Sequence, residues 1–87
     1  MAKTLKFKVE NDRGHLVEKT ADLVWVKARI RSDLNEQGYK SRFQVRQTSD
    51  NLVEIYDSKG HTMTYCYGGF DGYEVLEPHS HQNWPRQ

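Results

Sequence analysis

Residues 20–38, TADLVWVKARIRSDLNEQG, form the one segment of this sequence with a clear helical pattern. Its main apolar residues recur at intervals of three and four, which places them on one face of a helix: Leu23, Val26, Ile30 and Leu34. Thr20 or Asp22 is suited to cap the N-terminus of this helix. Gly38 stands where a left-handed residue would end it. The segment therefore predicts one amphipathic helix with one face directed at a core.

The segments on both sides of this helix alternate between polar and apolar residues, which is the pattern of half-buried strands. They are TLKFKVE (4–10), YKSRFQVRQ (39–47), LVEIY (52–56), HTMTYCY (61–67) and YEVLEP (73–78). HLVEK (15–19) is compatible with a short strand extension or a loop. DSKG (57–60) is typical of a turn with Gly60 in the left-handed position of a bulged hairpin. GGFDG (68–72) contains two dipeptides suited to a tight turn, so the register of the last hairpin stays open.

These elements predict a single α+β domain over residues 1–78. The expected order is β-α-β-β-β-β, with an antiparallel sheet of four or five strands and the helix packed on one face of it, since a single helix covers only one side. Residues 79–87 show no periodic pattern and are expected to form a flexible tail, from which Trp84 could dock onto the domain.

Composition excludes several classes of protein. The single cysteine, Cys66, cannot form an internal disulfide, so nothing indicates an oxidising compartment. No apolar run approaches the roughly 20 residues that span a bilayer, and the N-terminus lacks the apolar region of a signal peptide. We therefore expect a cytoplasmic protein with no membrane partner.

The charge is distributed unevenly although its total is only +1. Residues 1–47 contain eleven Lys and Arg against six Asp and Glu, a net charge of +5. Residues 48–87 contain two basic residues against six acidic ones, a net charge of −4. This asymmetry is compatible with a basic binding face or with two halves that neutralise each other across adjacent elements.

The basic residues of the strands fall on one face by alternation. Lys6, Lys8, Lys40, Arg42 and Arg46 would share the sheet face that the helix leaves open, and Lys27 and Arg31 would lie on the polar side of the helix. Long cations beside tyrosines can hold phosphates and stack bases, so the sequence predicts binding of RNA or single-stranded DNA. The alternative is an ordinary solvated face with cross-strand tyrosine pairs.

A second hypothesis rests on the Tyr- and Gly-rich hairpin. Tyr67, Phe70 and Tyr73 would offer large, rigid contact area to a protein partner. Size and the lack of catalytic motifs suggest an inhibitor or adaptor that a phage or mobile element encodes against a host or defence protein. Self-association through an edge strand also stays open, although Lys6 and Lys8 would discourage pairing on the first strand.

No residue pattern predicts an active site, a metal site or a cofactor. His79 and His81 supply too few ligands for a structural zinc site. His61 follows the turn glycine beside Lys59, which leaves a small metal-free ribonuclease as the enzymatic alternative. No phosphate-binding loop or paired-cysteine motif is present. We expect a binding protein that is not an enzyme and needs no cofactor.

Overall fold

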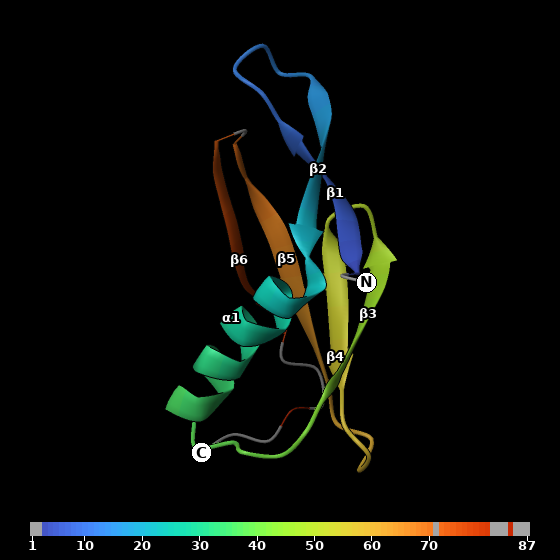
Figure 1. Ribbon diagram of the computed structural model, residues 1–87, viewed down its shortest axis with the longest axis vertical. Helices are drawn as coiled ribbons and strands as arrows, with labels where there is room; N and C mark the ends of the chain where they lie inside the picture. Colours follow the sequence, from blue (N-terminus) through green and yellow to red (C-terminus); the bar gives the residue numbers. More distant parts are fainter. Residues whose placement is uncertain (1–2, 71, 81–83, 85–87) are drawn as a thin grey trace.

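The computed structural model describes residues 3–70, 72–80 and 84. One helix and six strands follow in the order β-β-α-β-β-β-β (Figure 1): β1 (Thr4–Glu10), β2 (Leu16–Asp22), α1 (Leu23–Glu36), β3 (Gln44–Ser49), β4 (Leu52–Tyr56), β5 (Thr62–Phe70) and β6 (Tyr73–Ser80). No helix in this part of the chain is long and apolar enough to cross a membrane.

The strands form a four-stranded antiparallel sheet and a two-stranded hairpin. The sheet has the order β6-β5-β4-β3, and each strand pairs with the next along the chain. The hairpin of β1 and β2 meets this sheet at a parallel bridge between Glu10 and Phe70. It then twists away from the sheet, as Figure 1 shows. The α+β class, with one helix on one face of an antiparallel sheet, is confirmed.

The core lies between the sheet and a layer made of α1 and the β1–β2 hairpin. The helix face expected from the spacing is buried, with Val26, Ile30 and Leu34 inaccessible to solvent. The facing sheet residues are also buried: Val53, Ile55, Met63, Tyr65 and Tyr67. Phe7 of the hairpin stacks on Tyr67 with ring centroids 4.2 Å apart, so the hairpin closes the core beside the helix.

Both helix ends follow the sequence pattern. Asp22 is the N-cap, and its side chain accepts a hydrogen bond of 3.0 Å from the Val24 N–H. Gly38 has a φ of 81°, the left-handed conformation that glycine adopts most easily.

Two segments differ from the sequence-based expectation. Residues 16–22 form a full strand that pairs with β1 along its whole length, whereas residues 15–19 were expected to form a short extension or a loop and residues 20–22 to open the helical segment. Residues 39–43 were expected to begin a strand, but β3 starts only at Gln44. Lys40 and Arg42 therefore lie in the connection between α1 and β3 and not on a strand.

The register of the last hairpin is set by the turn after Phe70. Phe70 pairs with Tyr73, so Gly68 and Gly69 belong to β5 and do not form the turn. Gly69 has a φ of 96°, and a Cβ there would lie 2.4 Å from the carbonyl oxygen of Tyr73. Only glycine fits this position without displacing the backbone of β6.

Candidate functional site

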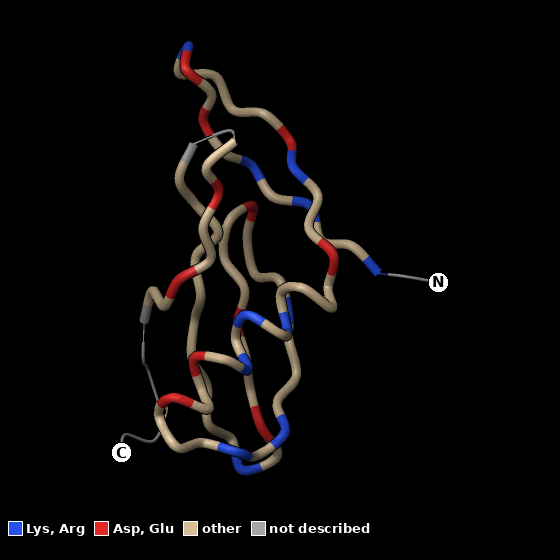
Figure 2. Tube along the Cα trace, turned by 60° about the vertical axis from the view of Figure 1, so that its left-hand side comes forward, with Lys and Arg blue, Asp and Glu red and all other residues tan. Residues whose placement is uncertain are grey.

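Four exposed cations come from three separate segments at one end of the molecule. Lys40 and Arg42 lie in the α1–β3 connection, Arg46 lies on β3, and Lys59 lies in the β4–β5 turn. We call these four residues the basic end. Figure 2 shows blue segments gathering where the α1–β3 connection meets the β4–β5 turn. Three of these cations come from the basic residues 1–47, and the fourth, Lys59, comes from the acidic residues 48–87.

An open groove of about 280 Å³ lies at the basic end. It is lined by Arg42, Phe43, Gln44, Tyr56, Asp57 and Ser58. Gln44 and Tyr56 are cross-strand partners in the β3–β4 register, so the groove lies where β3 begins and β4 ends. Phe43 and Tyr56 are half-buried, and they place aromatic rings in the groove beside the Arg42 side chain.

Arg46 belongs to this surface, but its guanidinium already contacts other side chains of the protein. Its guanidinium forms an ion pair with Glu54, its cross-strand neighbour. It also lies over the Tyr56 ring, 5.0 Å from the centroid. The hydrogen bond to Glu54 is the main cause of the raised pKa of Arg46. Glu54 thus neutralises part of the charge that the sequence assigned to this face.

Arg31 holds the α1–β3 connection in place. Its guanidinium donates to the carbonyl oxygens of Tyr39 at 3.3 Å and Ser41 at 2.5 Å, and it covers the Phe43 ring at 4.9 Å. These carbonyls would be paired with a neighbouring strand if residues 39–43 were extended in the sheet. Arg31 was expected to face a ligand, but its donors are turned to its own chain.

The carboxylate of Asp57 joins the α1–β3 connection to the β4–β5 turn. Its Oδ2 accepts from the Tyr39 hydroxyl and lies 2.7 Å from Nδ1 of His61. Its Oδ1 accepts from the backbone N–H groups of Lys59 and His61, each at 2.9 Å. The α1–β3 connection and the β4–β5 turn, which carry three of the four cations of the basic end, are therefore anchored to one buried side chain.

These hydrogen bonds keep Asp57 ionised. Burial alone would raise the pKa of Asp57, but the hydrogen bonds from Tyr39, His61 and the turn backbone outweigh burial and hold the pKa well below its usual range. Burial, together with the hydrogen bond to Asp57, raises the pKa of Tyr39. The Tyr39 hydroxyl therefore stays a donor, and His61 Nδ1 donates to a carboxylate that has no proton.

Trp84 docks against this network. Its ring lies 4.7 Å from the Tyr39 ring and 6.2 Å from the His61 ring, measured between centroids, and the residue is buried. Its indole Nε1 is buried and has no hydrogen-bond partner among the described residues. The expected tail is described only through Ser80 and at Trp84, and residues 81–83 and 85–87 lie outside the described residues.

The other predicted cations do not join the basic end. Lys6 and Lys8 are exposed on the β1–β2 hairpin, opposite Thr20 and Glu18 in its register. Lys27 is half-buried on α1. Figure 2 shows the blue segments of the hairpin interleaved with red ones, far from the gathering at the other end. The predicted basic face is thus divided between two parts of the molecule.

The predicted protein-contact residues also separate. Tyr67 is buried in the core, whereas Tyr73 is 80% exposed at the start of β6. The side chain of Phe70 lies outside the described part of the structure. Cys66 is half-buried, and burial followed by the nearby charge of Glu77 raises the pKa of its thiol. A raised pKa lowers the fraction of thiolate, which is opposite to the shift found at reactive cysteines.

Residues 3–70, 72–80 and 84 contain no group of three His, Cys, Asp or Glu side chains placed to hold a metal ion. His79 is exposed on β6, and His81 lies outside the described residues. Lys59 and Phe43 belong to the groove region but were not among the predicted ligand-binding residues. The DSKG turn pattern (57–60) could have predicted that Lys59 is exposed at the end of the sheet, because a hairpin turn presents its side chains there.

Comparisons of the whole chain with protein-family models, with curated proteins and with solved structures gave no match. The geometry of the chain itself therefore carries the functional argument.

Proposed function

We propose that this protein binds single-stranded nucleic acid, RNA or DNA, through the basic end, as a cytoplasmic binding protein and not as an enzyme. The observation that carries the proposal is a groove lined by Arg42, Phe43 and Tyr56 at the end of the molecule to which Lys40, Arg46 and Lys59 also belong. Phosphates would meet the cations, and one base would stack in the groove on the face of the Phe43 or Tyr56 ring opposite the guanidinium of Arg31 or Arg46.

Anchoring of the surface supports this proposal. Long cationic side chains on loose loops lose conformational entropy when they bind, which weakens affinity. Here the backbone beside Lys40 and Arg42 is held by Arg31, and the backbone beside Lys59 is held by Asp57. The ligand therefore has to order only the side chains, and the positions of the charges are set in advance.

The aromatic lining favours single strands over duplexes. A duplex keeps its bases stacked inside and offers phosphates and groove edges, but no free base face, to a protein surface. An unpaired base can leave its neighbours and enter the groove beside Arg42 and Tyr56. We therefore expect tighter binding of single-stranded RNA or DNA than of duplex DNA of the same length.

Fluorescence anisotropy tests the proposal directly. Labelled RNA, single-stranded DNA and duplex DNA, each about 12 nucleotides long, would be titrated with the protein at three salt concentrations between about 50 and 200 mM. This range includes physiological ionic strength, at which the screening length is about 8 Å. We expect saturable binding of the single strands that weakens steeply with salt. Absence of binding to all three probes at 50 mM salt would refute the proposed function.

A further inference from the structure

Trp84 joins a segment far along the chain to the hydrogen-bond network that anchors the basic end. Its ring packs on the rings of Tyr39 and His61, with centroids 4.7 Å and 6.2 Å apart. It is only 5% exposed, although it comes four residues after β6 ends at Ser80. Its indole Nε1 makes no hydrogen bond to the described residues, so the contacts of the ring are what fix Trp84 at this place.

Both residues on which Trp84 packs are partners of Asp57. The Tyr39 hydroxyl donates to Oδ2 of this carboxylate, and Nδ1 of His61 lies 2.7 Å from the same oxygen. The side chain of Asp57 is only 2% exposed. Hydrogen bonds that are shielded from water are stronger than those that compete with it. The Trp84 ring therefore adds to the shielding of the two side-chain hydrogen bonds that Asp57 accepts.

The residues on which Trp84 packs are also neighbours of the cations in the chain. Tyr39 directly precedes Lys40 in the α1–β3 connection. His61 follows Lys59 by two residues in the β4–β5 turn, and the backbone N–H groups of both donate to the same carboxylate at 2.9 Å. The ring thus packs on the two connections that carry three of the four cations of the basic end.

We propose that Trp84 is a positioning residue for nucleic acid at the basic end, so that the affinity of this site depends on docking of the C-terminal segment. This inference rests on the proposed function. Trp84 is buried and does not line the groove of the basic end, so it acts without touching a nucleotide. It keeps the α1–β3 connection and the β4–β5 turn in the arrangement that binds the ligand, and the ligand then does not have to order them.

The coupling between docking of Trp84 and binding of nucleic acid is reciprocal. A ligand that binds the docked arrangement more tightly also favours docking by the same factor. Such coupling typically changes affinity by roughly 5- to 150-fold. We expect about tenfold here, near the lower end of the range in, because two other anchors do not involve Trp84. They are the hydrogen bonds of Arg31 to the α1–β3 connection and the pairing of Arg46 with Glu54 on the strands.

Anisotropy titrations with single-stranded RNA at several salt concentrations test this inference. Trp84→Ala removes the ring and leaves every cation in place. We expect its affinity for RNA to be about tenfold lower at each salt concentration. The slope of log K against log salt should stay parental, because this slope reports the number of neutralised phosphates. Trp84→Phe retains an aromatic ring and should bind RNA within about twofold of the parent protein.

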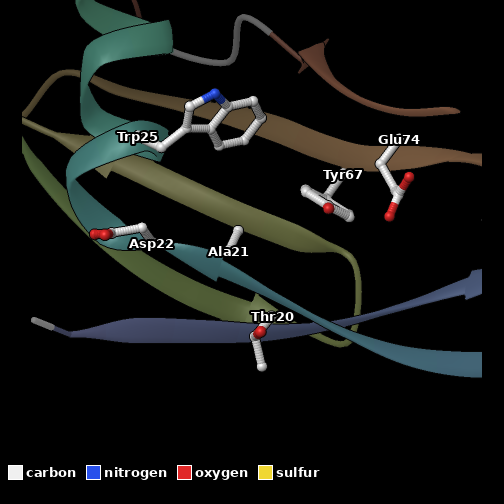
Figure 3. A pocket seen from close by; sticks show the side chains of 6 residues that line it. All are labelled: Thr20, Ala21, Asp22, Trp25, Tyr67 and Glu74. Carbon is white, nitrogen blue, oxygen red and sulfur yellow. The ribbon is translucent and has the colours of Figure 1, made fainter. Parts of the chain in front are cut away.

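Trp25, the other tryptophan of the chain, supplies the matched control. It projects from the first turn of α1 and lines a separate groove of about 380 Å³, with Tyr67 and Glu74 on the strands beyond it (Figure 3). This groove shares no lining residue with the groove of the basic end. Trp25→Ala should therefore leave both the affinity for RNA and its salt slope unchanged.

Tyr39→Phe tests the same link with a smaller change, and it decides the question if a thermal melt shows that Trp84→Ala does not fold. It keeps the ring that packs on Trp84 and removes the hydroxyl that donates to Asp57. We expect about threefold weaker RNA binding, since one hydrogen bond of the anchor is lost. When both variants fold, their losses should be less than additive in free energy, because both residues act through one network.

Four results would overturn the inference while leaving the proposed function intact. Trp84→Ala or Tyr39→Phe could bind RNA like the parent protein. Trp84→Ala could flatten the salt slope, which would mean that phosphate contacts were lost. Trp25→Ala could weaken binding as much as Trp84→Ala does, which would mean that loss of either tryptophan acts through general stability. Absence of RNA binding by the parent protein would instead refute the proposed function itself.

Discussion

Removal of two charges from the basic end should change how nucleic-acid binding depends on salt. Arg42→Gln combined with Lys59→Gln is the sharpest perturbation. Both side chains are exposed, and neither has a hydrogen-bond partner in the described residues. Glutamine retains much of the length and polarity of each side chain, so the variant should fold like the parent protein.

The size of the effect follows from the number of cations. A single strand releases about 0.7 counterions for each phosphate that is neutralised, so four cations predict a slope of log K against log salt of about −3. Over a fourfold rise in salt, this slope lowers affinity about 50-fold. The double variant keeps two cations, for which we expect a slope of about −1.4 and a loss of only about sevenfold over the same range.

Anisotropy titrations with a 12-residue single-stranded RNA measure these slopes. The matched control is Lys6→Gln combined with Lys8→Gln, which removes the same charge from the β1–β2 hairpin. The control should keep the parental slope. Equal flattening in both variants would mean that only the overall charge matters, and an unchanged slope in the Arg42 and Lys59 variant would refute the role of the basic end.

Three further changes probe the anchoring, the strand geometry and the charge of the site. Asp57→Asn should lower the free energy of unfolding by about 2 kcal/mol at pH 7, because a buried acceptor of four hydrogen bonds is weakened. The depressed pKa of Asp57 stabilises the fold at pH values above the unfolded pKa of about 3.9, and that contribution is lost as pH falls. Urea titrations at pH 7 and pH 3 should therefore show a smaller acid loss in the variant, and equal losses would contradict the network. Gly69→Ala should cost about 3 kcal/mol, since its φ is positive and a Cβ meets a backbone oxygen. Gly68→Ala is the matched control, with only an ordinary contact, and equal midpoints in urea would show that the strain is absent. Glu54→Gln should release Arg46 and tighten RNA binding about threefold in anisotropy, whereas weaker binding would mean that the ion pair is needed to position Arg46.

The helix could be predicted in detail because its signals are local. The apolar spacing, the N-cap and the glycine at position 38 all lie within one segment, and the structure selects Asp22 of the two predicted N-cap residues, Thr20 and Asp22. The turn at Gly60 is similar, with a φ of 86° in the position that the DSKG pattern indicated. Local geometry alone decides these features.

Strand β2 could not be recognised with the same certainty. Its sequence, LVEKTAD, alternates only weakly, and its inward positions include Lys19 as well as Val17 and Ala21. What makes it a strand is pairing along its whole length with β1, which is a contact between two segments. Strand propensity depends on such partners more than on the segment itself.

Residues 39–43 show the opposite error. Their alternation suits a strand, but Arg31 supplies donors to the carbonyls of Tyr39 and Ser41 in place of a neighbouring strand. Alternation does not reveal a side chain on a preceding helix that satisfies the backbone. Because residues 39–43 are not part of a strand, Lys40 and Arg42 lie at the basic end and not on the predicted sheet face. Their role in binding stays a prediction.

The measurement that tests the central claim most directly is a map of backbone amide shifts in a ¹⁵N-labelled sample titrated with a single-stranded 8-residue oligonucleotide. We expect the largest shifts in residues 40–46 and 56–61, with little change in residues 16–25. Shifts confined to the β1–β2 hairpin, or no shifts at millimolar oligonucleotide, would contradict binding at the basic end.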